Sequence, residues 1–185
     1  MASGSGVTIR RLATEELEPP EIERIRALLR AAFADDGAGF GEDDWAHALG
    51  GVHVVLSVDG RIASHGSVVE RELHVGDRVF RTGYVEAVAT AERDRGRGLG
   101  SIVMTEIGTV IRERFELGAL STGGHRFYER LGWLRWQGPT FVRTPDGPVR
   151  SADEDGGILV LPVPASGPLD RTLPISCDWR PGDAW

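Results

Sequence analysis

The sequence predicts an α/β (α+β) domain in which a central mixed, mostly antiparallel sheet is flanked by helices. Three patterns favour this class. Residues 52–90 contain three long β-type segments, and Asp59-Gly60 between the first two is a strong two-residue hairpin turn. Segments 19–33 and 99–115 carry apolar residues at helical spacing. Antiparallel strands followed by a strand, a helix and a strand are typical of mixed α/β architecture.

The N-terminal half begins with a short strand, VTIRRL at 7–12, in which apolar and polar residues alternate. A helix follows at 19–33, PPEIERIRALLRAAF, with proline at its start, where the missing N–H costs nothing. The segments VHVVLSV at 52–58, RIASHGSVVEREL at 61–73 and RVFRTGYVEAVAT at 78–90 are rich in β-branched residues. These three segments predict a β-meander.

The C-terminal half alternates helices with short strands. Helix 99–115 leads to LGAL at 117–120, which we predict as a buried strand, and HRFYERLGW predicts a short helix closed by Gly132. We expect PTFVRT at 139–144 and GILVLPV at 157–163 to pair across Pro145-Asp146-Gly147 and its loop. Residues 1–6 are expected to be a flexible leader, and 7–185 a single domain.

The charge balance indicates which ligands suit the protein. The chain has 28 Asp and Glu against 21 Lys and Arg, a formal net charge of -7. Nucleic acid is therefore not expected as a partner, because phosphate binding needs a basic face. No apolar run is long enough to cross a bilayer, and MASGSG lacks the apolar core of a signal peptide, so a cytoplasmic protein is expected. A cation is the natural complement of this charge.

The acidic residues cluster in three stretches. Each alone is most simply interpreted as a solvated turn, but together they could converge on one cation-binding cleft. The third stretch lies in CDWRPGDAW, where the terminal α-carboxylate adds a charge and burial of Trp179 and Trp185 would pin the tail. A C-terminal strand whose tryptophans complete a core or a dimer contact is the alternative. The clustered residues are Asp35, Asp36, Glu42, Asp43 and Asp44, then Asp153, Glu154 and Asp155, then Asp178 and Asp183.

A glycine- and arginine-rich loop, ATAERDRGRGLG, joins the third meander strand to the helix at 99–115. Backbone N–H groups at a helix start attract anions, and glycines let the backbone approach a phosphate closely. The spacing is neither a Walker loop nor G-x-G-x-x-G, so taken alone the loop is equally well explained as a flexible connection. The five histidines show no metal-ligand spacing, and we expect no metal.

Six motifs make the sequence resemble a known family, two at the level of a superfamily and four at the level of a narrower family. The spacing Arg95-x-x-Gly98-x-Gly100 after a strand resembles the pyrophosphate loop of the GCN5-related N-acetyltransferases (GNAT), and FYERLGW resembles their later helix. FADD at 33–36, GYVEAVA at 83–89, LGALS at 117–121 and the tail CDWRPGDAW are similar to the aminoglycoside 2′-N-acetyltransferases. The resemblance covers roughly residues 7–185. It implies a GNAT fold, acetyl-coenzyme A as co-substrate, an aminoglycoside substrate, antibiotic resistance and a homodimer.

The resemblance also implies roles for individual residues. Glu86 matches the proposed base, and on an apolar strand desolvation would raise its pKa; an outward-facing carboxylate is the alternative. Tyr128 matches the acid that protonates the coenzyme A thiolate; a core tyrosine at helical spacing from Leu131 is the alternative. Cofactor-binding residues implied by the match are Val88, Ala89, Thr90, Arg95, Gly96, Arg97, Gly98, Leu99 and Gly100.

Substrate-binding residues carry over to the acidic stretches. The set implied by the resemblance is Asp36, Asp44, Glu86, Ser121, Glu154, Asp183 and Trp185. The chain departs from the family pattern in a longer, glycine-rich acidic loop, a shorter segment between Ser121 and Tyr128, and a glutamate at 154 where aspartate is usual. These departures bear on the choice of sugar ring rather than on the reaction.

Two alternatives to an aminoglycoside acetyltransferase stay open. In the first, the acceptor is an endogenous amine, such as a polyamine or a cell-wall amino sugar; in the second, the protein is a non-catalytic acyl-coenzyme A or aminoglycoside binding module. Retention of Glu86 and Tyr128 argues against the binding module. Cys177 is not expected to carry an acyl group, because no His-Asp partner pattern accompanies it.

Overall fold

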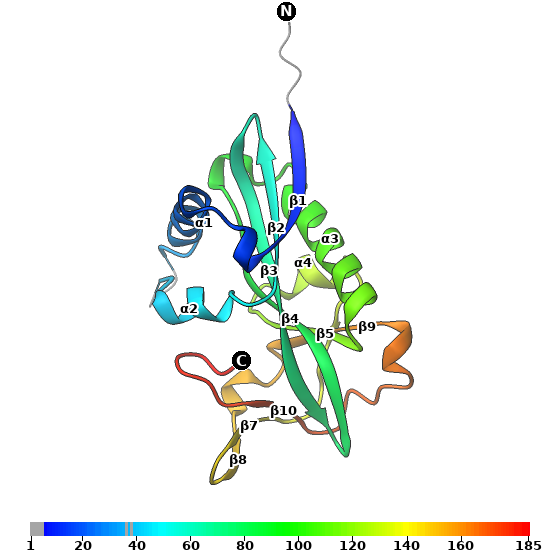
Figure 1. Ribbon diagram of the computed structural model, residues 1–185. Coiled ribbons are helices and arrows are strands. Elements are labelled where there is room, and N and C mark those ends of the chain that lie inside the picture. Colours follow the sequence, from blue (N-terminus) through cyan, green and yellow to red (C-terminus); the bar gives the residue numbers. More distant parts are fainter. Residues whose placement is uncertain (1–5, 36, 38) are drawn as a thin grey trace, which may run out of the picture. The chain divides into compact units, whose positions relative to one another are not determined.

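The computed structural model describes residues 6–35, 37 and 39–185 (Figure 1). They form two compact units, and each is described by itself. Unit 1 contains the residues up to Val69 and Val85–Ile107, and unit 2 contains Glu70–Tyr84 and Gly108–Trp185. Two strands and one helix contribute residues to both units: β3 (Arg61–Val75), β4 (Arg78–Thr90) and α3 (Leu99–Arg114).

Unit 1 contains strands in the order β1-β2-β3-β4, with β1 at Val7–Ala13 and β2 at Val52–Val58. Both β1–β2 and β2–β3 are antiparallel, and the turn between β2 and β3 is Asp59-Gly60, as predicted. Both turn residues have positive φ, at 50° and 76°, which is the backbone that a type I′ hairpin requires. The predicted meander is confirmed.

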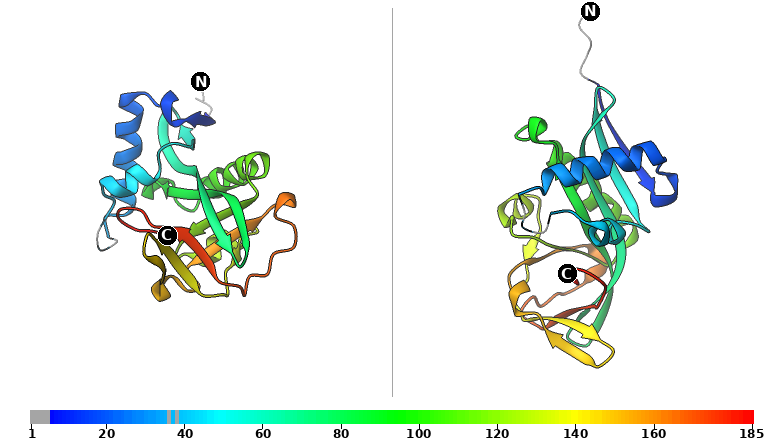
Figure 2. Two further views of the ribbon diagram at one scale, coloured as in Figure 1. Left: turned by 60° about the horizontal axis from the view of Figure 1, so that its bottom comes forward. Right: turned by 90° about the vertical axis from the view of Figure 1, so that its left-hand side faces the viewer.

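Helices cover both faces of the unit 1 strands. Helix α1 (Pro19–Ala32) lies across the strands (Figure 2) and buries Ile25, Leu28 and Leu29 with Trp45 of helix α2 (Glu42–His47). The start of α3 packs on the opposite face, where a Cβ added to Gly66 of β3 would lie 2.7 Å from Ile107 Cδ1. The glycine thus permits close packing of helix on strand.

Unit 2 contains the strand path β6-β9-β5-β4-β3-β10-β7-β8. Its strands and one helix are β5 (Leu117–Ser121), α4 (His125–Glu129), β6 (Leu134–Arg135), β7 (Thr140–Thr144), β8 (Gly147–Arg150), β9 (Ile158–Pro162) and β10 (Ile175–Asp178). Pairs β4–β5 and β7–β10 are parallel. Pairs β3–β10, β5–β9, β6–β9 and β7–β8 are antiparallel, so the predicted mixed, mostly antiparallel sheet is confirmed.

Two local expectations were wrong. The segment PTFVRT does not pair with GILVLPV: β7 pairs instead with β8, because Pro145-Asp146 makes a tight turn with Thr144 opposite Gly147. Strand β9 lies between β5 and β6, and this inner position buries its side chains at Ile158–Leu161. The acidic stretch before Trp45 is also not all loop, since Glu42–His47 is helical and Gly41 N–H donates to Asp44 Oδ2 at 2.7 Å.

Candidate active site

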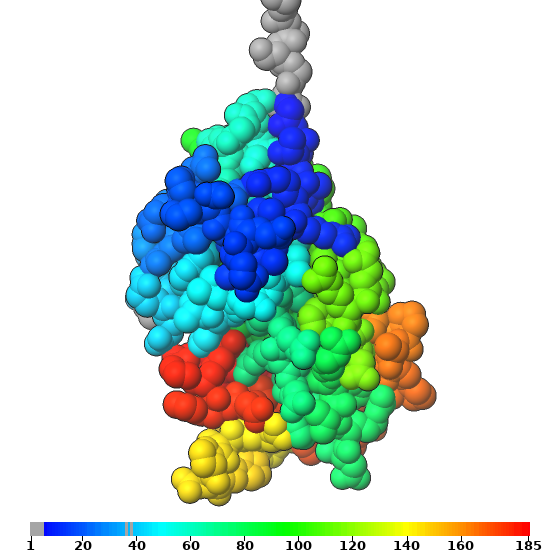
Figure 3. All heavy atoms as spheres, in the orientation of Figure 1, coloured from blue at the N-terminus to red at the C-terminus, as the bar shows by residue number. Residues whose placement is uncertain are grey.

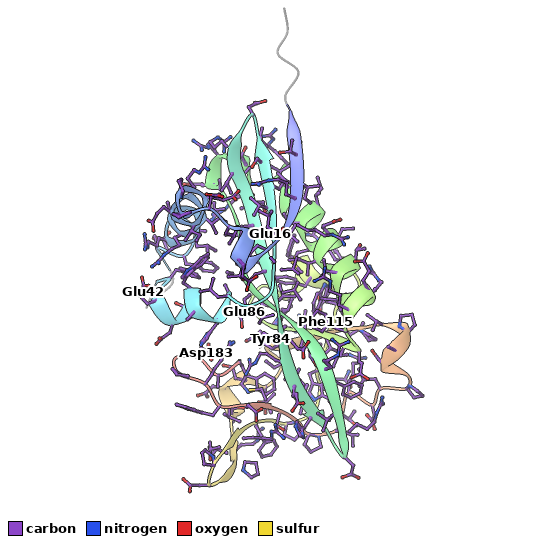
Figure 4. All side chains as sticks on the ribbon, in the orientation of Figure 1. Glu16, Glu42, Tyr84, Glu86, Phe115 and Asp183 are labelled. Carbon is purple, nitrogen blue, oxygen red and sulfur yellow. The ribbon has the colours of Figure 1, made fainter. Side chains whose placement is uncertain are left out.

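The predicted base Glu86 lies on β4, in unit 1, and is half-buried (Figure 4). The next residue, Ala87, has φ of 52°, in the left-handed region that side chains with a Cβ rarely adopt. Buried side chains of β3 donate to three β4 carbonyls here: Ser67 Oγ to Glu86 at 3.2 Å, His65 Nδ1 to Ala87 at 2.8 Å and Ser64 Oγ to Ala89 at 2.9 Å. The backbone beside Glu86 is therefore held firmly in an unusual conformation.

The predicted phosphate loop follows in unit 1. Gly96 and Gly98 have φ of 77° and 79°, so both need glycine, and Ile102 N–H donates to Gly98 C=O at 3.1 Å in the first turn of α3. Leu99, Gly100 and Ser101 lie before Ile102 in the first turn of the helix, so their backbone N–H groups have no intrahelical acceptor. This is the geometry of an anion-binding helix start.

A buried carboxylate organises the loop and was not predicted. Asp94 is 2% exposed and accepts hydrogen bonds from Arg61 at 2.7 Å and from Arg97 at 2.5 Å. The hydrogen bond from Arg61 is the largest cause that holds the pKa of Asp94 below its ordinary value. Arg97 is therefore already paired, whereas exposed Arg95 donates only a long bond of 3.3 Å to Thr90 C=O.

A pocket of about 710 Å³ lies beside this loop in unit 1. Helix α1, the β2–β3 turn and residues 91–95 line it, and its basic side chains are Arg24, Arg61, Arg93 and Arg95. Four arginines outnumber the two carboxylates of the lining, Asp35 and Glu92, so the pocket has an excess of positive charge. An elongated anion suits this pocket, in a protein whose overall charge is negative.

The predicted substrate residues of unit 2 come together at the ends of β5 and β9. Ser121 Oγ donates to Glu154 Oε2 at 3.0 Å. Burial is the largest cause that raises the pKa of Glu154. The hydrogen bond from Ser121 lowers this pKa, and the nearby charges of Asp183 and Asp153 raise it. Neighbouring carboxylates that repel one another favour the arrival of a cation. Asp155 differs, because Arg150 and Thr140 hold its carboxylate and lower its pKa to about 2.

The C-terminal tail folds back within unit 2 and lies at its surface (Figure 3). Trp185 is 4% exposed, and its Nε1 donates to Ser151 Oγ at 3.0 Å, close to Glu154 in sequence. One nitrogen of Arg71, on β3, donates to Asp178 C=O at 3.0 Å and to Ala184 C=O at 2.8 Å, which joins the two ends of the tail. The expected burial of Trp185 is therefore observed.

Trp179 does not share that burial, contrary to expectation. Its side chain is 59% exposed and lines a second pocket of about 940 Å³ with Phe141, Pro148 and His74, among others. The residue follows β10 directly, and Arg71 holds the preceding carbonyl rather than the indole. None of the predicted site residues that the structure describes lines this pocket.

Tyr128 lies on α4 in unit 2. Its ring makes edge contacts with Phe127 and Trp133, at centroid distances of 4.9 and 6.3 Å. Burial raises the pKa of its phenol to about 12, so the O–H is a donor at neutral pH. A protonated phenol is the form that an acid for a departing thiolate requires.

The two remaining predicted residues belong to the acidic stretch before Trp45. Asp36 lies outside the described residues. Asp44 caps α2 through Gly41, which gives its carboxylate a structural partner. Among the described residues, no group of three His, Cys, Asp or Glu side chains is placed to hold a metal ion, and no helix is long and apolar enough to span a membrane.

Comparison with known proteins gives this geometry a family. Residues 13–135 match the acetyltransferase (GNAT) domain family. The chain belongs to the GNAT family of acetyltransferases. Within it, the chain is similar to the aminoglycoside 2′-N-acetyltransferase of Mycolicibacterium fortuitum, with 43% identity over 182 residues, 96% of this chain and 92% of that protein. The resemblance read from the sequence motifs is thereby confirmed.

Solved structures agree on the fold. A GNAT family N-acetyltransferase of Escherichia coli, in complex with CoA, superposes with a TM-score of 0.67 at 18% identity, over 96% of this chain and 92% of that chain. A GNAT acetyltransferase of Brucella melitensis, in complex with acetyl-CoA, gives a TM-score of 0.55 at 17% identity, over 84% of this chain and 96% of that chain. The expected GNAT fold is confirmed.

Proposed function

We propose that the protein transfers the acetyl group of acetyl-coenzyme A directly to the 2′-amino group of aminoglycoside antibiotics and so confers resistance to them. The observation that carries the proposal is the acidic cluster of unit 2, where Glu154, Asp183 and the pinned Trp185 gather beside Ser121. The 43% identical relative is named for this activity. A polycationic amino sugar needs several carboxylates around it rather than an apolar pocket.

The co-substrate suits the basic end of unit 1. The start of α3, with Gly96, Gly98 and Gly100, would hold the pyrophosphate through backbone N–H groups. Arg95 and the arginine-lined pocket would neutralise the remaining phosphate charge. Backbone amides at Val88, Ala89 and Thr90 would bind the pantetheine arm and polarise the thioester carbonyl. Two of the solved relatives are bound to CoA or acetyl-CoA.

The chemistry needs one base and one acid. An aminoglycoside arrives as an ammonium, so a proton must leave before the nitrogen lone pair can attack the thioester carbonyl. We assign this step to Glu86, through a water molecule. When the carbon–sulfur bond breaks, Tyr128 would donate its proton to the thiolate and would regain one as the product nitrogen loses its second proton. Glu86 would release the first proton to solvent. The product amide carries no charge, so the drug loses one of the cationic contacts with its target.

The acceptor would be held by Asp36, Asp44, Ser121, Glu154, Asp183 and the main-chain oxygens of Trp185. Arg180 Nε donates to Asp183 C=O at 2.8 Å, and Trp185 N–H donates to Asp183 Oδ1 at 3.2 Å, so the tail is internally braced. A braced carboxylate cluster loses little conformational freedom when an amine binds. A cytoplasmic homodimer without a bound metal remains our expectation for the working enzyme.

The decisive experiment measures thiol release from acetyl-coenzyme A with tobramycin, which has a 2′-amine, and with kanamycin A, which has a hydroxyl there. We expect turnover with tobramycin alone. Turnover with both would retain the acetyltransferase and overturn the 2′ assignment. Turnover with neither would point to an endogenous amine or to a binding module.

A further inference from the structure

A chain of hydrogen bonds runs through unit 1 from a surface loop to β4, and the proposed reaction does not use it. Gly50 N–H donates to Thr14 Oγ1 at 2.9 Å, and Thr14 Oγ1 lies 2.9 Å from His53 Nε2. His53 Nδ1 lies 3.0 Å from His65 Nε2, and His65 Nδ1 lies 2.8 Å from Ala87 C=O. Both histidines are 0% exposed. The chain ends on the residue that follows Glu86.

The chemistry of its two ends fixes the direction of every bond. Burial lowers the pKa of His53 to about 4 and of His65 to about 3, so both rings are neutral and each has one N–H. The Ala87 carbonyl can only accept, so His65 carries its proton on Nδ1 and accepts at Nε2. His53 must then donate from Nδ1 and accept at Nε2, where the Thr14 hydroxyl donates. Gly51 C=O, the other acceptor near Thr14, already receives the Thr14 N–H at 3.1 Å.

The two histidines of the chain are enclosed, whereas Thr14 is half-buried. His53 and His65 are diagonal neighbours on β2 and β3, since His53 pairs with Ser67 and His65 with Val55. The Trp45 ring, 6% exposed, lies 6.0 Å from the His53 ring. A buried polar network of this kind is stabilising only when every donor and acceptor is matched, which the assigned directions achieve.

The carbonyl at the end of the chain belongs to a strained residue. Ala87 has φ of 52°, a left-handed conformation that is unfavourable for a residue with a Cβ. Such strain persists only where neighbouring bonds over-determine it. The neighbours of Ala87 in sequence are Glu86, the assigned base, and Val88, the assigned amide donor. A relaxation of Ala87 toward extended backbone would rotate both groups.

We propose that His65, oriented by His53 and Thr14, is a positioning residue that locks Ala87 in its left-handed conformation and so aims the Glu86 carboxylate and the Val88 amide for acetyl transfer. The proposal rests on the proposed function for the identity of those two groups. The structural part, a directed Thr14–His53–His65 chain that ends on Ala87, stands without it.

The structural part is tested first by NMR on the full chain with ¹⁵N-labelled histidine. We expect both His53 and His65 to show the spectrum of the Nδ1–H tautomer at pH 7, whereas free histidine prefers Nε2–H. Signals from an Nε2–H tautomer for His65 would overturn the proposal, because that ring could not donate to Ala87.

Two substitutions of His65 separate positioning from packing. Asparagine carries its amide on Cγ, where His65 carries Nδ1, whereas glutamine carries its amide one atom further out, near the position of Nε2. We expect His65→Asn to keep the bond to Ala87 and a kcat within about three-fold of wild type. We expect His65→Gln to lose that bond and lower kcat by about 10- to 100-fold, with both KM values nearly unchanged.

A packing role predicts the opposite order, because glutamine fills the histidine cavity better than asparagine does. If His65→Asn is the slower enzyme, or if the two variants are equal, the proposal fails. Thr14→Val and Thr14→Ser supply a second pair should the core variants not fold, and only the valine is expected to lower kcat. His74→Asn and His74→Gln, in unit 2, are the matched controls and should not differ in kcat.

The Val88 amide resonance separates this inference from the proposed function. It should shift in His65→Gln and stay in place in His65→Asn. If wild-type protein does not acetylate tobramycin, the proposed function fails while the resonance still reports on Ala87. If wild-type protein turns over and the resonance is the same in both variants, the positioning role fails alone.

Discussion

At the scale of single residues, Glu86 is the most direct test of the chemistry. It is half-buried beside a backbone that Ser67 and His65 hold. We expect Glu86→Gln to lower kcat for tobramycin by about 10²- to 10⁴-fold, the usual contribution of a general base, with a small change in KM for acetyl-coenzyme A. Glu70→Gln is the control, because Glu70 is exposed and pairs with Arg81 at 3.2 Å. An unchanged kcat in Glu86→Gln would assign proton removal to solvent.

Tyr128 gives a prediction about pH as well as rate. Burial raises the pKa of its phenol to about 12, so the group stays protonated throughout the working range. We expect Tyr128→Phe to lower kcat by the same factor at every pH between about 6 and 9. The wild-type phenol stays protonated over this range, and the variant has no phenol to titrate. Steady-state rates across that range provide the measurement. A loss that grows or vanishes with pH would show that another group supplies the proton.

The residues that organise the site were harder to predict than the residues that act in it. Glu86, Tyr128 and Ser121 stand in motifs that are recognisable locally. Asp94 was missed because its partners, Arg61 and Arg97, become neighbours only after folding. Arg71 was missed for the same reason, since it bonds to Ala184 across 113 positions of sequence. A side chain whose hydrogen-bond partners are distant in sequence forms no periodic pattern or local motif by which it could be predicted.

At the scale of elements, the position of the C-terminal tail depends on Arg71. Its guanidinium joins Asp178 to Ala184 and stands over the Tyr84 ring, 4.7 Å from the centroid. We expect Arg71→Met to release the tail and raise KM for tobramycin by about ten-fold or more, the cost of charge-assisted hydrogen bonds, while KM for acetyl-coenzyme A changes less than about two-fold. Removal of Trp185 should act in the same direction.

Arg81→Met is the matched control for this prediction, because Arg81 is exposed and its ion pair with Glu70 lies outside the tail. Surface ion pairs of this kind contribute little. An equal rise of both KM values in Arg71→Met would instead identify Arg71 as a general packing residue of unit 2. Steady-state kinetics with each substrate varied in turn distinguishes the two results.

Elements with a clear hydrophobic period could be predicted, and irregular ones could not. Helix α1 and strand β2 agree with the sequence pattern because packing and local preference favour the same structure. Helix α2 was missed because it is short and acidic, is preceded by glycines, and has one buried apolar side chain, Trp45, which is too little for a helical period. The predicted partner of β7 was wrong because Pro148 makes residues 147–150 an unpromising strand. Strand β8 lies at the end of the sheet path, however, where proline is tolerated.

At the scale of the whole molecule, charge and histidine burial govern how the protein responds to its solution. A net charge of -7 attracts a polycation over distance, so salt should slow aminoglycoside capture more than it slows turnover. The two neutral histidines act on stability instead. Above about pH 4 they take up a proton only when unfolding exposes them.

The sign of this effect follows from proton linkage. Unfolded histidine binds a proton below about pH 6.5, whereas folded His53 and His65 do so only near pH 4 and 3. Between about pH 6.5 and 4 the unfolded chain therefore holds more protons, so the free energy of unfolding falls as pH falls, by about 1.4 kcal/mol per pH unit for each histidine. Burial also lowers the pKa of His74, which adds to the effect, and raises that of Glu154, which opposes it.

Urea denaturation at pH 7.0, 5.5 and 4.5 measures this dependence. Wild-type protein should lose stability at each step, and His65→Asn should lose about 1.4 kcal/mol less per pH unit, because one fewer buried histidine is then protonated on unfolding. His74→Asn, at the half-buried histidine of unit 2, should flatten the dependence less. A free energy of unfolding that stays constant from pH 7.0 to 4.5 would mean that the two histidines are protonated in the folded protein, and the hydrogen-bond directions assigned to the Thr14–His53–His65 chain would then be wrong.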